Sequence, residues 1–121
     1  MFDGKRILCI APCYNELHKI DKVILRMDMS VVDEVLVVDD GSDDGSPETA
    51  KALGATVIRL EKTLGVGVAI RTGIEYGTAN HFDIIVIIAG NNKDDPQEIP
   101  KLLSPITKEE YDFIRENFIN F

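Results

Sequence analysis

Continuous runs of hydrophobic residues recur along this chain, and a polar segment follows each of them. The clearest run, residues 35–38, holds four consecutive apolar residues, three of them valine. A short run without polar alternation is typical of a strand buried on both faces of a parallel sheet. Three further runs predict strands in the same way: 5–11, 55–60 and 83–89.

The segments between these runs show helical patterning. Hydrophobic residues at helical spacing within 17–27 share one face, and Asn15 stands before them as a candidate cap. Segment 47–53 begins with proline, as helices often do, and further helices are expected from 64–73 and from Pro96. The alternation predicts a doubly wound α/β sheet. Right-handed crossovers then place the loops after the first, second and fourth strands along one edge.

The polar segment that follows the 35–38 run is rich in acids and glycines. It contains Asp39, Asp40, Gly41 and Gly45, with two more aspartates between the glycines. Open α/β sheets place their ligands at such strand ends, and the two glycines free the backbone to turn. The alternative is a solvated turn whose acids cap the helix that starts near Ser46. One cap needs fewer acids than this segment holds, which favours a ligand site.

Composition limits the classes of function. The 121 residues suffice for one domain, and a net charge of −8 excludes a nucleic-acid groove but not a nucleotide pocket. No apolar run approaches the length of a membrane span and no signal peptide is visible. Cys9 and Cys13 fit neither a redox pair nor a zinc site. We therefore expect a soluble, cytoplasmic protein.

Four motifs together resemble the family 2 glycosyltransferases, most closely the branch of dolichyl- and polyprenyl-phosphate sugar synthases. They begin at Pro12, Val38, Gly65 and Asp95, and they read P-x-Y-N-E, VDDGS-x-DG, G-x-G-x-AIR and DP-x-EIP. The resemblance implies a three-layer α/β/α GT-A fold, which is Rossmann-like and has a mainly parallel sheet. It also implies a single nucleotide-sugar-binding domain over 1–121, truncated after the fourth or fifth strand.

The resemblance assigns roles to residues of the nucleotide pocket. It implies that Asp39 binds the base, usually at uracil N3, and that Asp40 lies near the ribose. An acid that accepts a hydrogen bond from a ring N–H discriminates between bases. Arg71 matches a basic residue that reaches the diphosphate, although a solvated charge on a helix is an equal alternative. The other residues of the implied pocket are Pro12, Tyr14, Glu16 and Gly41. For Tyr14, packing beside the pocket is as well supported as contact with the base.

The chain departs from the family at the cation site. There the fourth strand is followed by an Asp-x-Asp motif that holds Mg²⁺ or Mn²⁺ against the sugar diphosphate. Here the aligned residues are Ala89-Gly90-Asn91, and Lys93 stands where the family often has glutamine. Hard cations prefer carboxylate oxygens, so the usual metal site is expected to be lost or weakened. Three alternatives stay open: Lys93 neutralises the diphosphate, Asp94 and Asp95 hold the metal instead of capping a helix, or no chemistry follows binding.

The end of the chain departs as well, because residues 111–114 look like a strand of the family but the Gly-Ser-Arg motif that normally follows that strand is missing. Residues 1–110 match the family, whereas 111–121 form an atypical apolar tail. Hydrophobic residues at positions 111, 114, 118 and 121 have helical spacing. The tail is therefore a candidate amphipathic helix that covers a sheet edge or pairs two chains into a homo-oligomer.

The expected function is binding of a nucleotide-diphosphate sugar for transfer to a polyprenyl-phosphate or saccharide acceptor. A UDP-sugar is favoured, and GDP-mannose is possible. No catalytic base is assigned, because His18 and His81 are expected at the surface. The first alternative is a truncated, non-catalytic nucleotide-binding or scaffolding homologue. The second is a receiver-like regulatory domain, which would need acids after the first strand, where this chain has Pro12-Cys13-Tyr14-Asn15.

Overall fold

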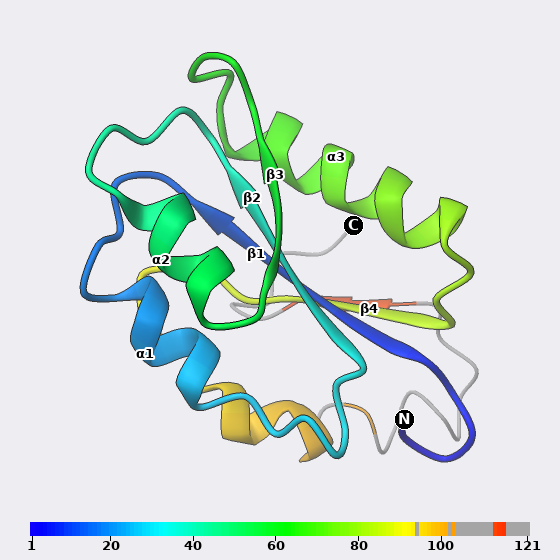
Figure 1. Cartoon of the computed structure of the whole chain (residues 1–121). Helices are drawn as coiled ribbons and strands as arrows, with labels where there is room; N and C mark the ends of the chain where they lie inside the picture. Colours follow the sequence, from blue (N-terminus) through cyan, green and yellow to red (C-terminus); the bar gives the residue numbers. More distant parts are fainter. Residues whose placement is uncertain (94, 102, 104–112, 116–121) are drawn as a thin grey trace.

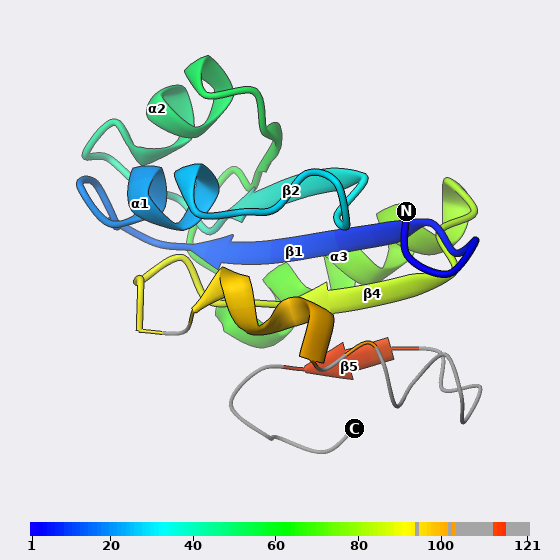
Figure 2. The same ribbon diagram turned by 90° about the horizontal axis from the view of Figure 1, so that it is seen from below.

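The computed structural model describes residues 1–93, 95–101, 103 and 113–115. The strands of these segments form a single parallel sheet in the order β3-β2-β1-β4-β5. Figure 2 shows β2, β1, β4 and β5 side by side, with β1 inside the sheet. The strands are β1 (Ile7–Cys13), β2 (Glu34–Asp39), β3 (Thr56–Arg59), β4 (Ile84–Ile87) and β5 (Phe113–Arg115).

Helices cover both faces of the sheet (Figure 1). Helices α1 (Ile20–Leu25) and α2 (Ser46–Ala52) lie on one face, and α3 (Val66–Ala79) lies on the other. The side chains of β1 alternate between two buried clusters. Cys9 packs in the cluster that includes α1, and Ile10 packs in the cluster that includes α3. This arrangement confirms the predicted three-layer α/β/α fold. None of the described helices is long and apolar enough to cross a lipid bilayer.

Helix α3 approaches the sheet closely because glycines face it. A Cβ atom added at Gly73 would lie 2.7 Å from methyl groups of Ile10, and one added at Gly77 would lie 2.7 Å from Ile85. No side chain fits at these distances, so the two glycines set the packing distance between α3 and the sheet. The N-terminus of α3 is thereby held beside the carboxyl ends of β1 and β2.

Three local expectations differ from the structure. Strand β1 does not end before Pro12 but continues to Cys13. Pro12 lies beyond the last pair of the β1–β4 ladder, Ile10 with Ile87, so its missing N–H removes no ladder bond there. Asn15 adopts a left-handed conformation with φ of 50° and does not cap α1, which begins only at Ile20.

The third difference concerns the tail. Ile114 pairs with Val86 as part of β5 and does not lie in a helix. Strand β5 thus extends the sheet along the outer edge of β4. The other positions of the predicted amphipathic pattern, 111, 118 and 121, lie outside the described residues, as does Asp94.

Candidate functional site

A pocket of about 190 Å³ lies at the carboxyl edge of the sheet, between the loops after β1, β2 and β4 and the first turn of α3. This is the edge at which the crossovers were expected to gather the loops. Pockets for whole small molecules usually exceed about 300 Å³, so this one suits part of a larger ligand. Its lining consists of Pro12, Cys13, Tyr14, Glu16, Asp40, Val66, Ala69, Ala89, Gly90 and Asn91.

The pocket brings together five of the residues that the sequence proposed for the site: Pro12, Tyr14, Glu16, Asp40 and Asn91. The remaining predicted residues lie outside its lining. Asp39 is the last residue of β2, Gly41 lies in the loop after it, and Arg71 is exposed on α3. Lys93 and Asp95 belong to the loop after β4.

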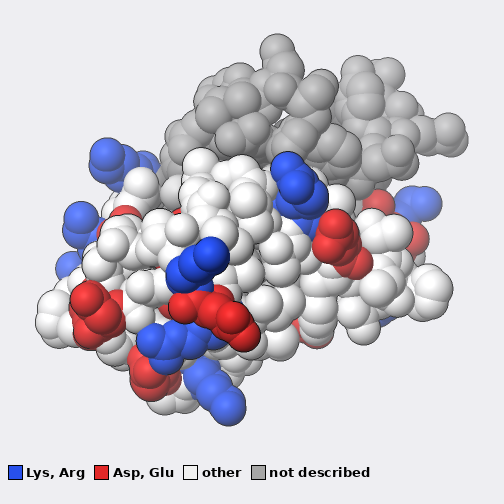
Figure 3. Space-filling view, turned by 90° about the horizontal axis from the view of Figure 1, so that it is seen from above, with Lys and Arg blue, Asp and Glu red and all other residues white. Residues whose placement is uncertain are grey.

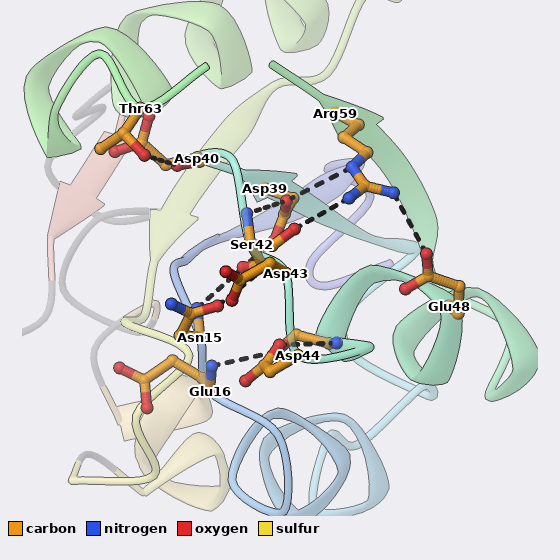
Figure 4. A network of polar contacts seen from close by, with 11 residues as sticks. Asn15, Glu16, Asp39, Asp40, Ser42, Asp43, Asp44, Glu48, Arg59 and Thr63 are labelled. Atoms are coloured by element: carbon orange, nitrogen blue, oxygen red, sulfur yellow. Dashed lines mark hydrogen bonds and ion pairs between the residues drawn. The ribbon is translucent and has the colours of Figure 1, made fainter. Parts of the chain in front are cut away.

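Asp39 is fully buried, and both of its carboxylate oxygens are engaged by other groups of the protein (Figure 4). Its Oδ1 accepts a hydrogen bond from the Ser42 hydroxyl at 2.5 Å, and its Oδ2 accepts one from the Ser42 backbone N–H at 2.9 Å. The Arg59 Nε lies 3.9 Å from the same Oδ2. Burying a charge is costly unless it is paired and hydrogen-bonded, and Ser42 and Arg59 meet that requirement.

Arg59 reaches this position because of the register of the sheet. Asp39 and Arg59 are direct partners at the carboxyl ends of β2 and β3. The guanidinium also donates to the Ser42 carbonyl at 2.8 Å and to Glu48 at 3.1 Å. It therefore links the end of β3, the loop after β2 and the start of α2 (Figure 4).

Asp40 lines the pocket but is only 6% exposed. Its carboxylate accepts backbone hydrogen bonds from Leu64 at 2.7 Å and from Gly65 at 3.0 Å. The Thr63 hydroxyl donates to the Asp40 carbonyl at 2.9 Å. These bonds fix the start of α3 against the end of β2.

Gly41 is required by the same close approach. Its φ is +85°, and an added Cβ would lie 2.9 Å from the Thr63 backbone nitrogen. A side chain at this position would push the loop before α3 away from Asp40. Gly41 thus allows the close packing between Asp40 and the start of α3, both of which line the pocket.

Polar bonds join the loop after β1 to the loop after β2. The Ser42 and Ser46 hydroxyls accept from the backbone N–H groups of Asn15, at 2.8 Å, and Glu16, at 3.0 Å. In return, the Asn15 side chain accepts from the Asp43 backbone at 3.0 Å. The left-handed Asn15 is therefore a connector between two loops.

Asp44 completes this connection. Its carboxylate accepts from the Leu17 backbone N–H at 3.0 Å and from both the backbone and the hydroxyl of Ser46. Burial acts to raise the pKa of Asp44, but the hydrogen bonds from Ser46 and Leu17 outweigh it and hold the pKa below its usual value. Asp44 is therefore ionised at neutral pH.

Cys13 contributes no nucleophile to the pocket. Burial raises the pKa of its thiol to about 12, and the nearby Asp39 carboxylate adds to this effect. The thiolate is the reactive form, and a thiol with this pKa stays neutral at pH 7.

The loop after β4 has a different character. The Asn91 Oδ1 accepts from the Lys93 backbone N–H at 3.1 Å, and the Asn92 Oδ1 accepts from Arg26 at 3.2 Å. Asp95 forms an ion pair with Arg26 at 2.8 Å and caps the short helix η1 (Pro96–Glu98) by accepting from the Gln97 backbone. This is the capping role that the sequence analysis set against metal binding.

The described residues do not offer a cation a ready set of ligands. Nowhere among them do three His, Cys, Asp or Glu side chains converge on one point. Among the described residues, Glu16 and Asp40 are the carboxylates that line the pocket, and Asp40 already accepts two backbone hydrogen bonds. On the face shown in Figure 3, basic side chains lie next to acidic ones, without a broad basic patch that would attract phosphate.

Sequence reasoning missed the supporting residues, chiefly Arg59, Ser46 and Arg26. A signal for Arg59 was present: predicted parallel strands at 35–38 and 55–60 place the end of the third strand beside the acids. No comparable signal marks Arg26, because its partners lie in the loop after β4, far along the chain.

A parallel sheet in this order, with helices on both faces and a polar pocket at the carboxyl edge, defines a doubly wound protein of the Rossmann-like class. The comparisons with known proteins identify the family. The chain belongs to glycosyl transferase family 2, whose family model matches residues 9–118.

Two curated relatives show the branch. The chain is 32% identical to the undecaprenyl-phosphate mannosyltransferase of Micrococcus luteus, over 84% of this chain and 44% of that protein. It is 27% identical to the UDP-N-acetylglucosamine–dolichyl-phosphate N-acetylglucosaminyltransferase of Methanococcus voltae, over 91% of this chain and 51% of that protein. The chain thus spans about half the length of these relatives, and both are named for lipid-phosphate acceptors.

A solved structure matches the fold. It is the glucosyl-3-phosphoglycerate synthase of Mycobacterium tuberculosis in complex with Mn²⁺, UDP and glucosyl-3-phosphoglycerate. The TM-score is 0.68 with 32% sequence identity, over 85% of this chain and 40% of that one. The chain therefore has the GT-A fold that the resemblance predicted.

Proposed function

We propose that the pocket binds the nucleotide part of a sugar donor, with a UDP-sugar favoured over GDP-mannose. The chain then supplies the donor-binding part of a glycosyltransferase that acts on a polyprenyl-phosphate or saccharide acceptor. One observation carries this proposal: Pro12, Tyr14, Glu16, Asp40 and Asn91, drawn from three separate loops, line a single pocket. The complexes of the Mycobacterium synthase with UDP and with Mn²⁺ support a nucleotide ligand and, in that enzyme, a cation.

The roles follow from exposure. Tyr14 is 49% exposed and offers a ring face to a base, while the Glu16 carboxylate offers an acceptor to ring N–H or ribose hydroxyl groups. Asp40 lines the pocket, but its two oxygens already accept from Leu64 and Gly65. Asp39, which the resemblance assigns to the base, is buried against Ser42, so its contact with a base requires the Ser42 hydroxyl to turn away. Arg71 enters the proposal only for a ligand whose diphosphate extends beyond the pocket.

Calorimetric titration of UDP and of GDP, with Mn²⁺ present, tests the proposal. We expect UDP to bind more tightly, and Glu16→Gln to weaken binding about fivefold through loss of a charged acceptor. Glu75→Gln makes the same change at an exposed site on α3 and serves as the control. Failure of both nucleotides to bind contradicts the proposal and points to a scaffold.

The second candidate function is nucleotide binding without sugar transfer. The lack of charge at the pocket-lining residues Ala89 and Asn91 of the loop after β4 favours it. Transfer of a labelled sugar to a polyprenyl phosphate, or hydrolysis of the donor, by the purified chain excludes it. Self-association through residues 111–121 belongs to this candidate, and a monomer by light scattering at micromolar concentration contradicts that part.

A further inference from the structure

In the described part of the loop after β4, which leaves out residue 94, the side-chain oxygens of Asn91, Asn92 and Asp95 are engaged by the protein. The Asn91 Oδ1 accepts from Lys93, the Asn92 Oδ1 accepts from Arg26, and the Asp95 carboxylate pairs with Arg26. A hard cation needs several free oxygens, preferably charged ones. The guanidinium of Arg26 therefore occupies oxygens of Asn92 and Asp95 that could otherwise serve as metal ligands.

The same contacts leave donors free. Because the Asn91 Oδ1 is bonded to the Lys93 backbone, the amide N–H groups are the remaining polar atoms of this pocket-lining side chain. The Lys93 side chain is exposed and has no carboxylate partner among the described residues. An amide donor and an ammonium attract an anion and repel a metal ion.

The start of α3 agrees with this polarity. Val66 and Ala69 place the first turn of α3 against the pocket, and that turn contains no acid. Gly65, at the N-cap of this 14-residue helix, provides no side-chain bond. Its own N–H and that of Leu64 already donate to Asp40, so the donors for a ligand are the backbone N–H groups after Gly65. The diphosphate side of the pocket is thus furnished with donors from two elements.

We propose that this pocket takes the diphosphate of its ligand without a divalent cation, with the Asn91 amide and the Lys93 ammonium acting in its place. The proposal rests on the proposed function, since it concerns how the same nucleotide is held. It distinguishes this chain from the Mycobacterium synthase, whose complex contains Mn²⁺.

Titration of UDP in excess chelator, and again with Mn²⁺, tests the cation directly. The expected result is one dissociation constant, equal within about twofold under both conditions. Binding that requires Mn²⁺ overturns the inference but leaves the proposed function standing. Absence of binding under both conditions overturns the proposed function instead, so the two failures are distinguishable.

Two variants assign the donors. In chelator, Lys93→Ala is expected to weaken UDP binding about tenfold, and Asn91→Asp to weaken it similarly while making the remaining binding respond to Mn²⁺. Lys5→Ala, an exposed lysine before the opposite end of β1, is the control for charge. Matching circular dichroism melting curves establish that each variant is folded. Unchanged affinity in Lys93→Ala, or in Asn91→Asp, overturns the assignment of that residue.

Discussion

The loops after β2 and β4 lie at the same carboxyl edge of the sheet, yet their charged side chains have different roles. The end of β2 and the loop after it contain four aspartates, and three of them accept hydrogen bonds from the protein itself: Asp39, Asp40 and Asp44. The loop after β4 faces the pocket with Ala89, Gly90 and Asn91, which carry no charge.

The difference shows that an acid at a strand end is not by itself a ligand group. In the loop after β2, two carboxylates fix neighbouring segments through hydrogen bonds from their backbone N–H groups. Asp40 holds the start of α3, and Asp44 holds the loop after β1. The loop after β4 is held by Arg26 through Asn92 and Asp95, and its residues that line the pocket carry no acid. The loop after β2 thus stabilises the walls of the pocket, whereas the loop after β4 supplies groups that face its proposed ligand.

Asp39→Ala is the largest test of this division. Removing the buried carboxylate leaves the Ser42 donors and Arg59 without their acceptor, so we expect about 3 kcal/mol lower free energy of unfolding in urea. Asp43→Ala, in the same loop but exposed, is the control and is expected to change stability by less than about 0.5 kcal/mol. Equal losses for the two variants would contradict a building role for Asp39.

Gly41→Ala comes next. The added methyl group would lie 2.9 Å from the Thr63 backbone nitrogen, and the alanine must adopt the positive φ of Gly41. We therefore expect the free energy of unfolding to fall by about 2 kcal/mol. Gly45→Ala has a similar φ of +89° but open space around the new Cβ, and it is expected to cost about 1 kcal/mol. Thermal unfolding of both variants measures the difference, which isolates the contact with Thr63. If Gly41→Ala were no less stable than Gly45→Ala, the loop before α3 would have moved to accommodate the methyl group without a measurable cost in stability.

Asp44→Asn should change the pH dependence of stability. The pKa of Asp44 is lowered in the folded protein, so its ionised form stabilises the fold above the unfolded value, about 3.9. That contribution is lost as the pH falls through the folded pKa. We therefore expect the variant to be about 1 kcal/mol less stable at pH 7, with the gap closing below about pH 4. Urea unfolding between pH 3 and 7 measures it, and a constant gap would contradict the prediction.

Arg26→Met should have the smallest effect. Arg26 and Asp95 are both well exposed, and exposed ion pairs stabilise folds by about 0.5 kcal/mol. The variant keeps the length of the side chain while removing the bonds to Asn92 and Asp95. Urea unfolding at pH 7 is the measurement. A loss as large as that of Asp39→Ala would mean that the loop after β4 is built as tightly as the loop after β2.

The fold was predictable because its signals are strong and local. Continuous apolar runs located four strands of the sheet, and crossover handedness placed the pocket at the correct edge. Details failed where tertiary bonds outweighed local preference. Asn15 reads as a helix cap, but Ser42 and Asp43 from the next loop hold it in a left-handed turn. A strand near Phe113–Arg115 was indicated only by the resemblance to the family, and its pairing with β4 was not predicted.

The candidate site was predictable as a set of positions but not as a set of bonds. The resemblance to the family indicated Tyr14 and Glu16, and the strand-end acids indicated Asp40; all three line one pocket. The sequence does not reveal whether a carboxylate faces a ligand or a backbone N–H. That depends on loops distant in the chain, such as the one at Leu64 and Gly65 that engages Asp40.

The position of β1 inside the sheet also governs the order in which the molecule is assembled. On the ribosome β1 is made first, but its partners on the far side arrive only with β4, where Ile7 pairs with Ile84. Until then a fully apolar strand has one unpaired edge, and such non-local parallel pairing is slow and exposed to aggregation. The loop after β4 is the last of the pocket loops to be synthesised, so a nascent chain acquires its binding pocket only when β4 has joined the sheet.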